Sequence, residues 1–362
     1  MASVELRNLR KTYDKKNWAV DDVSLTIPDG ELLALLGPSG CGKSSTMRMI
    51  AGLEELTSGE IYFDGQLINR VPPQKRNVAM VFETYALYPT LTVYENLAFP
   101  LRSAGWAKQD ITKRVDEIVD ILGVQEFLTH KPRELSSGQS QLVGLGRALM
   151  RQPNVFVMDE PISHLDTRLR SRMRSYIKRL HLDLGYTMLY VTHDQEEAMA
   201  LADRIAIMER GKIVQAGTPQ EIFHDPINMY VGGFVGEPPM NFLACQAERQ
   251  NDTLSLSYKG HAIPLPGDTA ATRQDIPRDV VVGVRPFYID SAPAPSDRHT
   301  IPADVFVVEA MGDSAVISVN AEDTRLQVVT ESHTTIRSGD TVWLGIDPAY
   351  MLLFDQVTGA RL

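Results

Sequence analysis

The sequence has little cysteine, no long apolar run and no excess of basic residues. Its 362 residues include only two cysteines, Cys41 and Cys245, too few for a disulfide framework and typical of a reducing compartment. No apolar run reaches the roughly 18 residues that a membrane-spanning helix needs. The formal net charge is -10 at pH 7, so no broad basic surface can neutralise the phosphates of a nucleic acid. Disulfide-rich, membrane-spanning and nucleic-acid-binding classes are therefore disfavoured.

The length favours two domains, because a single hydrophobic core rarely grows beyond about 250–300 residues. Hydrophobic residues make up 43% and charged residues 23%, which is ordinary globular composition. Glycine and proline cluster in GGFVGEPPMNFL (232–243), and helical periodicity stops there. We therefore predict a first domain over residues 1–236 and a second over residues 237–362.

The first domain has the pattern of a parallel α/β sheet. Residues 1–30 alternate apolar and polar positions between turn signals, which predicts short antiparallel strands. ELLALL (31–36) is a buried-strand run that leads through glycines into the helical pattern KSSTMRMIAGL. VFVMDE (155–160) and TMLYVTH (187–193) each follow a helical segment, as parallel sheets require. Residues 87–152 are mostly helical in pattern and predict a helical subdomain.

The second domain consists of short apolar runs separated by turn signals. The runs are DVVVGVRPFYI, ADVFVVEAM, SAVISV, RLQVVT, DTVWLGI and MLLFD. Several short strands at this spacing predict a small barrel or sandwich.

A phosphate-binding loop is predicted between the strand at 31–36 and the helix that follows it. GPSGCGKSS fits the pattern G-x-x-x-x-G-K-[ST] in the strand-to-helix context that the pattern needs. Glycines let successive N–H groups turn toward one point, where the helix N-terminus adds partial positive charge. Lysine reaches the β- and γ-phosphates, and the serine after it supplies a hydroxyl to Mg²⁺. The candidate ATP-binding residues are Gly37, Pro38, Ser39, Gly40, Cys41, Gly42, Lys43, Ser44 and Ser45.

Acidic and imidazole side chains stand at the ends of the two later strands, where ligands of open α/β sheets bind. Asp159 is placed to hold a Mg²⁺ that bridges the phosphates, and Glu160 to polarise an attacking water as general base. His193 can orient that water or a γ-phosphate oxygen. The alternatives are a solvated strand end or helix cap for the acids and a structural role for the histidine.

These segments, with ELSSGQSQL, VFVMDEPISHLD and LYVTHD in this order, resemble the nucleotide-binding subunits of ABC transporters. FETYALYPTLTVYENLAFPL is similar to the Q-loop segment of the sugar-importer branch, typified by the maltose importer ATPase. VVGVRPFYI and DTVWLGIDPAYMLLFDQVTGARL resemble the regulatory domain of that branch. The resemblance covers essentially the whole chain. It implies an α/β P-loop NTPase domain of the ABC type with a helical subdomain, followed by an all-β, oligonucleotide-binding-like regulatory domain.

The resemblance also implies a dimer that closes head to tail around two ATP molecules with Mg²⁺. In it, the signature residues Ser136, Ser137, Gly138 and Gln139 complete the partner's site. Tyr13 falls where an aromatic ring stacks on adenine, although a plain strand tyrosine is the alternative. Asp166 matches the D-loop residue that communicates across the dimer, and it also fits as N-cap of the next helix.

The partners implied are a second ATPase subunit, two transmembrane permeases and, indirectly, an extracytoplasmic solute-binding protein, without nucleic acid. MASVELRNLRKTYDKK lacks the apolar segment of a secretion signal, so we expect a cytoplasmic protein, peripheral on the inner face of the cell membrane. YALYPTL (85–91) is where the family receives a helix of the permeases, with core packing as the alternative. The solute expected from the family is a sugar, polyol or glycerol-type compound.

The arginine-rich segment TRLRSRMRSYIKRL does not predict a nucleic-acid interface. Arg168, Arg172 and Arg179 share one helical face, and Arg170, Arg174 and Lys178 share another. The charge is therefore distributed rather than striped, and we expect a solvated helix.

Four departures from the family pattern bear on mechanism. Glu83 replaces a glutamine that touches Mg²⁺ and water, so it either binds the metal more strongly or repels the γ-phosphate. Ser137 replaces the first signature glycine and adds a Cβ near the γ-phosphate. Ser140, Gln141 and Leu142 replace an R-Q-R pattern and remove two positive charges. Phe287 replaces a common glutamate, which puts any regulatory contact there in doubt.

These departures lead to two hypotheses about turnover. Because Glu83 and Ser137 belong to opposite sites of the dimer, pairing with a different ATPase subunit would place only one change in each site.

The favoured function is an ATP-hydrolysing importer subunit, and the alternative is an ATP-binding regulatory subunit with little hydrolysis of its own. A DNA-repair or translation ATPase fits poorly with the acidic charge.

Overall fold

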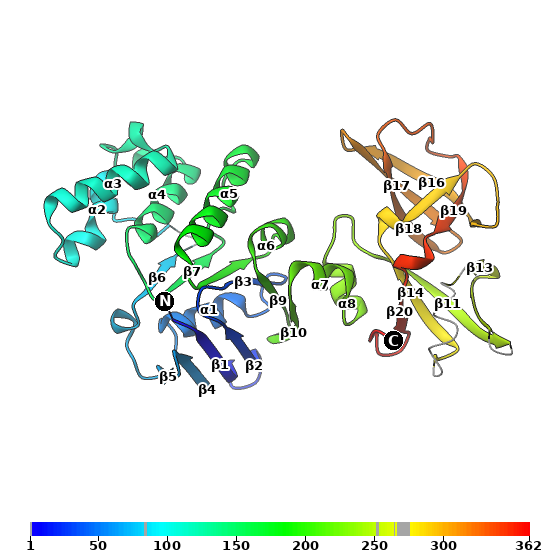
Figure 1. The fold of residues 1–362 in the computed structure, drawn as a ribbon, viewed down its shortest axis with the longest axis horizontal. Coiled ribbons are helices and arrows are strands. Elements are labelled where there is room, and N and C mark those ends of the chain that lie inside the picture. Colours follow the sequence, from blue (N-terminus) through cyan, green and yellow to red (C-terminus); the bar gives the residue numbers. More distant parts are fainter. Residues whose placement is uncertain (1, 83–84, 251–252, 264, 266–275) are drawn as a thin grey trace. The chain divides into compact units, whose positions relative to one another are not determined.

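The chain divides into two compact units (Figure 1), Met1–Pro219 and Gln220–Leu362. Each unit has its own hydrophobic core. The computed structural model describes residues 2–82, 85–250, 253–263, 265 and 276–362. The division falls earlier than the sequence-based boundary at 236/237, because α8 (Met229–Phe234) and nearly all of α7 (Pro219–His224) belong to the second unit. In the part of the chain so described, no helix is long and apolar enough to cross a membrane.

The first unit is built on two sheets. A six-stranded sheet has the order β10-β9-β3-β8-β7-β6, with β10 antiparallel to β9 and the other neighbours parallel. A four-stranded antiparallel sheet has the order β2-β1-β4-β5. The strands are β1 (Val4–Thr12), β2 (Trp18–Ile27), β3 (Leu32–Leu36), β4 (Ser58–Phe63), β5 (Gln66–Leu67), β6 (Val78–Val81), β7 (Val155–Asp159), β8 (Met188–Thr192), β9 (Arg204–Glu209) and β10 (Lys212–Gly217). The predicted strands β1, β2, β3, β7 and β8 are confirmed, and the sequence analysis missed the others.

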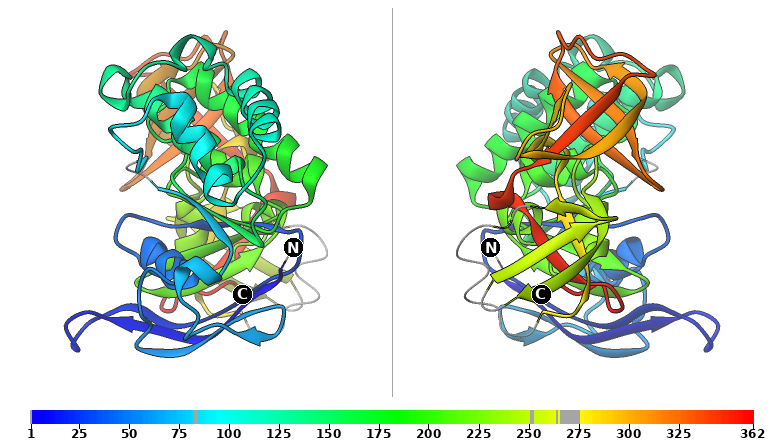
Figure 2. Two further views of the ribbon diagram at one scale, coloured as in Figure 1. Left: turned by 90° about the vertical axis from the view of Figure 1, so that its left-hand side faces the viewer. Right: turned by 90° about the vertical axis from the view of Figure 1, so that its right-hand side faces the viewer.

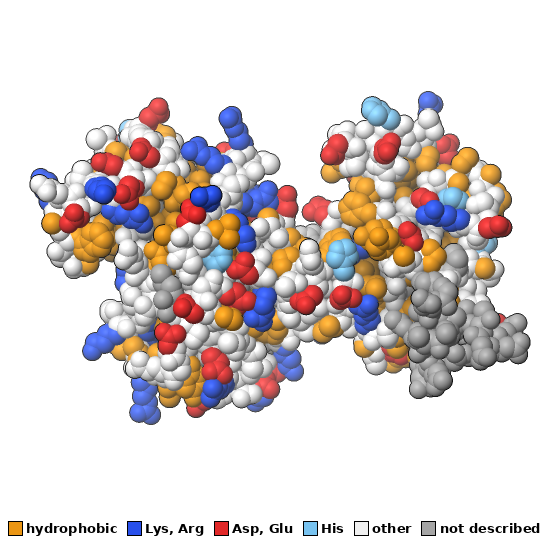
Figure 3. All heavy atoms as spheres, in the orientation of Figure 1, with side chains coloured by type: hydrophobic (Ala, Val, Ile, Leu, Met, Phe, Trp, Pro, Cys, Tyr) orange, Lys and Arg blue, Asp and Glu red, His pale blue; other side chains and the backbone are white. Residues whose placement is uncertain are grey.

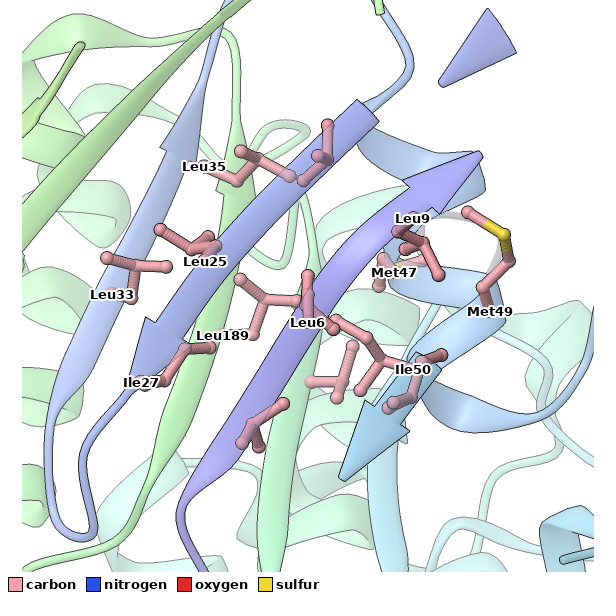
Figure 4. Close-up of a cluster of buried hydrophobic side chains, with 14 of the residues drawn as sticks. Leu6, Leu9, Leu25, Ile27, Leu33, Leu35, Met47, Met49, Ile50 and Leu189 are labelled. Atoms are coloured by element: carbon pink, nitrogen blue, oxygen red, sulfur yellow. The ribbon is translucent and has the colours of Figure 1, made fainter. Parts of the chain in front are cut away.

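The core of this unit lies between the two sheets. Figure 4 shows the apolar side chains of β1, β2, β3 and α1 (Lys43–Ala51) that meet there: Leu6, Leu9, Leu25, Ile27, Leu33, Leu35, Met47, Met49 and Ile50. Leu32, Ala34 and Leu36, the alternate residues of β3, are also buried. The strand is apolar throughout because both faces of a central parallel strand are covered.

The predicted helical subdomain contains α2 (Val93–Ser103), α3 (Lys108–Leu122) and α4 (Ser137–Leu149). Figures 1 and 2 show α2 and α3 at the end of the first unit remote from β1 and β2. The three helices pack closely at Gly146, where an added Cβ would lie 2.9 Å from Leu97 and 3.3 Å from Ile118. Two further helices, α5 (Thr167–Leu184) and α6 (Gln195–Leu201), follow β7 and β8.

The second unit is β-rich. Its two antiparallel five-stranded sheets have the orders β13-β12-β11-β14-β20 and β15-β19-β16-β17-β18. The strands are β11 (Asn241–Gln250), β12 (Thr253–Tyr258), β13 (His261–Ile263), β14 (Asp279–Val284), β15 (Ile289–Ala292), β16 (His299–Ala310), β17 (Ser314–Ala321), β18 (Thr324–Glu331), β19 (Thr341–Ile346) and β20 (Leu352–Asp355). The predicted small β fold is confirmed, but β11 to β13 were not predicted.

Candidate nucleotide site

A hollow of about 800 Å³ in the first unit gathers many of the predicted site residues. Its lining consists of Tyr13, Ala19, Pro38, Ser39, Gly40, Gly42, Lys43, Ser44, Ser45, Glu160 and His193. These residues come from the segments that follow β1, β3, β7 and β8, from the start of β2 and from α1. The sheet order explains the gathering, because β3, β8 and β7 are parallel neighbours whose carboxyl ends share one edge.

The loop between β3 and α1 needs glycine for steric reasons. Gly42 has φ 109°, and a Cβ there would lie 2.3 Å from the carbonyl oxygen of Ala19. A Cβ on Gly37 would lie 2.3 Å from the carbonyl oxygen of Met208. Gly42 is also the N-cap of α1 and provides no side-chain cap, unlike Ser136 of α4 or Asp166 of α5. The first amides of α1 are therefore left for an anion at the helix N-terminus.

Lys43 holds the loop from inside. Its side chain is 6% exposed, and Nζ donates to the carbonyl oxygens of Gly37 at 2.7 Å and Pro38 at 2.9 Å. Cys41 is a buried residue of the same loop, and burial raises the pKa of its thiol. The Lys43 side chain is held against the loop backbone by its two carbonyl acceptors.

Tyr13 stands at the edge of the hollow. It follows the last residue of β1, so it is not a strand tyrosine, and it is 63% exposed. Its hydroxyl lies 2.9 Å from Oγ of Ser45, and Nζ of Lys11 lies 4.9 Å from its ring centre. Partial burial and Glu54 raise the pKa of Tyr13. The phenol is anchored to the phosphate loop, and the ring remains available for stacking.

The predicted metal ligands are partly brought together. Oγ of Ser44 lies 3.4 Å from Oδ1 of the buried Asp159. Glu83, the third candidate ligand, lies outside the described residues. Within the described ranges no group of three or more His, Cys, Asp or Glu forms a metal cage. A hydroxyl and one carboxylate suit Mg²⁺, which takes the rest of its ligands from substrate phosphates and water.

Glu160 and His193 form a direct pair. Nδ1 of His193 lies 2.8 Å from Oε1 of Glu160. Glu160 has φ 47°, a left-handed conformation that is rare for a residue with a side chain. Its N–H donates to the carbonyl oxygen of Val191 at 2.9 Å, which extends the β7–β8 pairing by one residue. The two side chains therefore meet because they leave adjacent parallel strands at the same level.

The signature residues do not line this hollow. Ser136 caps α4 in a capping box: its Oγ accepts from the N–H of Gln139, and Oε1 of Gln139 accepts from the N–H of Ser136. Oγ of Ser137 lies 3.0 Å from the hydroxyl of Tyr85. A Cβ on Gly138 would lie 3.3 Å from the side chain of Leu165. The residues that the sequence grouped as a signature thus form the first turn of α4, against the segment that follows β7.

Asp166 is the N-cap of α5, since its Oδ1 accepts from the N–H of Leu169 at 2.9 Å. The capping interpretation is confirmed, and a role across a dimer stays a prediction.

The arginine-rich helix α5 is less solvated than expected. Arg170, Arg174 and Lys178 pair with Asp194 at 3.6 Å, Glu196 at 2.8 Å and Asp203 at 3.1 Å. The other face, with Arg168, Arg172 and Arg179, is exposed. One of the two predicted faces thus fastens α5 to α6 and to Asp203. On the face shown in Figure 3, acidic and basic side chains are interspersed.

A second hollow of about 620 Å³ lies beside the segment 85–91. Tyr88 and Phe99 line it, with ring centres 4.6 Å apart, and Arg147 lies 5.3 Å from the Tyr88 ring. Both aromatic residues are exposed, and no residue of 85–91 is buried. Core packing of this segment is therefore excluded.

The sequence analysis missed residues that act through the fold. Gln141 is 1% exposed and contacts the backbone of Glu160, a contact that the motif gave no reason to expect. Leu142 is buried too, so the loss of a positive charge there concerns packing as well as electrostatics. In the second unit Phe287 is exposed, in the short helix Pro286–Tyr288.

Comparison with family models agrees with this architecture. A model described as ABC transporter matches residues 20–163, one described as MalK OB fold domain matches 236–286, and one described as TOBE domain matches 282–354. A solved dimeric ATP-binding cassette in a post-hydrolysis state with ADP and Pi has a TM-score of 0.56 at 30% identity. That likeness covers 60% of this chain and 98% of the cassette.

Several relatives are similar to this chain over its full length. The trehalose/maltose import ATP-binding protein of Thermococcus litoralis is 42% identical over 372 residues, covering 100% of both chains. The sulfoquinovosyl glycerol transport ATP-binding protein of Agrobacterium fabrum is 42% identical over 359 residues, covering 99% of both. The sn-glycerol-3-phosphate import ATP-binding protein of Cupriavidus necator is 40% identical over 366 residues, covering 100% of both.

Proposed function

Because this chain belongs to the ABC transporter family and is an ATPase of its importer branch, we propose that it hydrolyses ATP in the hollow that Glu160 and His193 line. The observation that carries the proposal is the meeting of the phosphate loop with this acid–imidazole pair in one hollow. Hydrolysis resets a dimer that ATP has closed, and this cycle drives solute import.

Each side chain has a role that follows from its position. Lys43 and the amides at the start of α1 bind the β- and γ-phosphates, and Tyr13 stacks on the adenine. Glu160 takes a proton from the attacking water, and His193 holds both the Glu160 carboxylate and a γ-phosphate oxygen. Ser44 and Asp159 hold Mg²⁺, which when bound neutralises charge developing on the phosphates. Glu83 is the third candidate ligand.

The signature residues serve the partner's nucleotide. Ser136, Ser137, Gly138 and Gln139 stand away from this chain's own hollow, which supports a head-to-tail dimer in which they face the other ATP. Asp166 lies in the segment between Glu160 and α5 and communicates across the dimer. We infer a heterodimer, in which Glu83 and Ser137 fall in different sites. Purification of the transporter with only one ATPase species, in two copies, would contradict the heterodimer.

The hollow beside 85–91 suits a helix from a membrane permease. Its exposed Tyr88 and Phe99 offer apolar contact, and Arg147 offers a charged contact. Docking there on two permeases places the protein at the inner face of the cell membrane. The relatives are named for trehalose or maltose, sulfoquinovosyl glycerol and sn-glycerol-3-phosphate, so the solute is a sugar, polyol or glycerol-type compound.

The variant Glu160→Gln tests the proposal. We expect kcat for ATP hydrolysis to fall by about 10²- to 10⁴-fold, because a neutral amide cannot accept the proton of water. Binding of ATP should be retained, since the phosphate loop is unchanged. Steady-state phosphate release and equilibrium ATP binding measure the two effects, with the full chain alone and with its permeases.

The matched control is Glu196→Gln, an exposed acid of α6 that pairs with Arg174 and should leave kcat unchanged. Unaltered turnover in Glu160→Gln would refute the assignment of the base. Tight ATP binding by the wild-type chain without turnover, even with permeases, would establish the regulatory, non-hydrolysing subunit instead.

A further inference from the structure

Gln141 occupies an unusual place in the first unit. It belongs to α4 just after the signature residues, and its side chain is 1% exposed. Nε2 donates to the backbone carbonyl oxygen of Glu160 at 3.1 Å, and Oε1 accepts from the N–H of His164 at 3.2 Å. One partner is an acceptor only and the other a donor only, so the two bonds fix the orientation of the amide.

The bond to Glu160 bears on a strained residue. A left-handed conformation costs a residue with a side chain on the order of 1–2 kcal/mol, and it persists only where neighbours hold it. Here the N–H of Glu160 is bound to Val191, and its carbonyl oxygen accepts from Gln141 and from Oγ of Ser163 at 3.1 Å. The direction in which the Glu160 side chain leaves the backbone depends on these contacts.

The second bond extends the hold to the segment before α5. His164 lies between Glu160 and Asp166 in the sequence. Gly138 of α4 packs on Leu165, the residue after His164. Gln141 therefore binds both ends of the turn 160–164 to the helix whose first turn carries the signature residues. Gln141 is thus a buried side chain that connects α4 directly to the Glu160 carbonyl.

We propose that Gln141 is a positioning residue for ATP hydrolysis, which aims the Glu160 carboxylate by holding its backbone and links that aim to the signature helix. The inference rests on the proposed function, because it gives Gln141 a task only where Glu160 is the base. In the dimer, α4 faces the partner's nucleotide. Binding of ATP in the partner's site therefore affects the position of Glu160 in this chain's own site through the Gln141 bond.

The first test is the pair of variants Gln141→Met and Gln141→Glu in the full chain. Methionine keeps the length of the side chain and removes both bonds, whereas ionised glutamate can still accept from His164 but cannot donate to Glu160. We expect kcat to fall by about 10- to 100-fold in both, since misplacing a reacting group by about 1 Å has effects of that size. KM and the dissociation constant for ATP should stay within about twofold, because the phosphate loop is untouched.

The second test separates positioning from a general structural role. In the Glu160→Gln background, Gln141→Met should leave the residual turnover unchanged, because its effect passes through the carboxylate that is already absent. Ser140→Ala, on the same helix, is the matched control and should leave kcat at the wild-type value. Thermal unfolding midpoints verify that each variant is folded. If Gln141→Met does not fold, Gln141→Glu takes its place in this test.

Three results would overturn the inference: wild-type kcat in Gln141→Met, a parallel rise in KM, or an equal loss of residual turnover in the Glu160→Gln background. If the wild-type chain hydrolyses ATP and the Gln141 variants match it, only the positioning role fails. Absence of hydrolysis by the wild-type chain with its permeases would instead refute the proposed function.

Discussion

A buried carboxylate supports the segment that carries His193. Glu197 of α6 is 2% exposed, and its Oε2 accepts from the hydroxyls of Tyr190 and Thr192, both at 2.9 Å. Oγ1 of Thr192 in turn accepts from the N–H of Asp194 at 2.9 Å. Residues on either side of His193 are thus fastened to one acid. Burial raises the pKa of Glu197 above 4.5, against the lowering effect of the two hydroxyls.

This pKa predicts a pH dependence of stability that glutamine should remove. The folded state holds the Glu197 proton more tightly than the unfolded state does. The stability that this difference adds is fully present below pH 4.5 and is lost as the pH rises through the pKa of Glu197 in the folded state. Asp194 and Arg170 are the charged groups that act on it. We expect Glu197→Gln to gain stability relative to wild type as the pH rises above 4.5, until the carboxyl is ionised.

Urea unfolding of both proteins at a series of pH values measures this difference. Glu196→Gln is the control for loss of a carboxyl group on α6, because Glu196 is exposed and lacks the burial that acts on Glu197. A difference between Glu197→Gln and wild type that stays constant with pH would contradict the argument.

At the scale of elements, one arginine fastens α7 and α8 to a strand of the second unit. Arg285 follows β14 and is 3% exposed, and its guanidinium donates to the carbonyl oxygens of Gly232, Val235 and Phe223. Its Cζ lies 4.2 Å from the ring centre of Phe223. Burial lowers the pKa of Arg285 to about 10, which leaves it charged at neutral pH. In the sequence this arginine was only part of a family pattern. The carbonyl acceptors that surround it in the structure explain why an arginine is buried here.

Replacing Arg285 should loosen the second unit. Arg285→Met keeps apolar bulk but leaves three carbonyl groups without their donor, and hydrogen bonds to charged groups contribute roughly 1.5–3 kcal/mol each. Since three such bonds are lost together, we expect the free energy of unfolding of that unit to fall by at least about 4 kcal/mol. Chemical unfolding measures the loss.

The control for this replacement is Arg325→Met. Arg325 is exposed and lies over the exposed ring of Phe306, so the change should cost less than about 0.5 kcal/mol. Equal effects of the two variants would contradict the role given to Arg285.

At the scale of the whole molecule, the chain has two cores and the nucleotide hollow belongs to one of them. The described lining residues all lie within the first unit, and the second unit has its own apolar cluster between its sheets. A ligand that binds only the native form of one unit stabilises that unit by mass action.

Calorimetry should therefore show two transitions, of which nucleotide shifts one. With Glu160→Gln, we expect ATP and Mg²⁺ at 100 times the dissociation constant to stabilise the first unit by about 2.7 kcal/mol and to leave the second transition in place. Lys43→Ala is the control that should abolish the shift. A single transition, or equal shifts of both, would contradict independent units.

The sequence by itself determined the features that depend on local spacing. Glycines, lysine and serine in GPSGCGKSS, between an apolar strand and a helix, predicted the loop that the structure contains. The acids and histidine at strand ends predicted a shared edge, and the order of the motifs predicted the family and fold. Apolar runs of strand length predicted most of the second unit, but not the strands β11 to β13 or the helices α7 and α8.

Only the tertiary structure decided which distant residues touch. Gln141 and Glu160, Tyr85 and Ser137, and Arg285 and Gly232 are pairs that no periodicity of a helix or strand connects. The same holds for the basic face of α5, whose acidic partners follow β8. Local patterns report only neighbours within a few residues, whereas the burial of an amide or a guanidinium requires partners that folding brings from elsewhere in the chain.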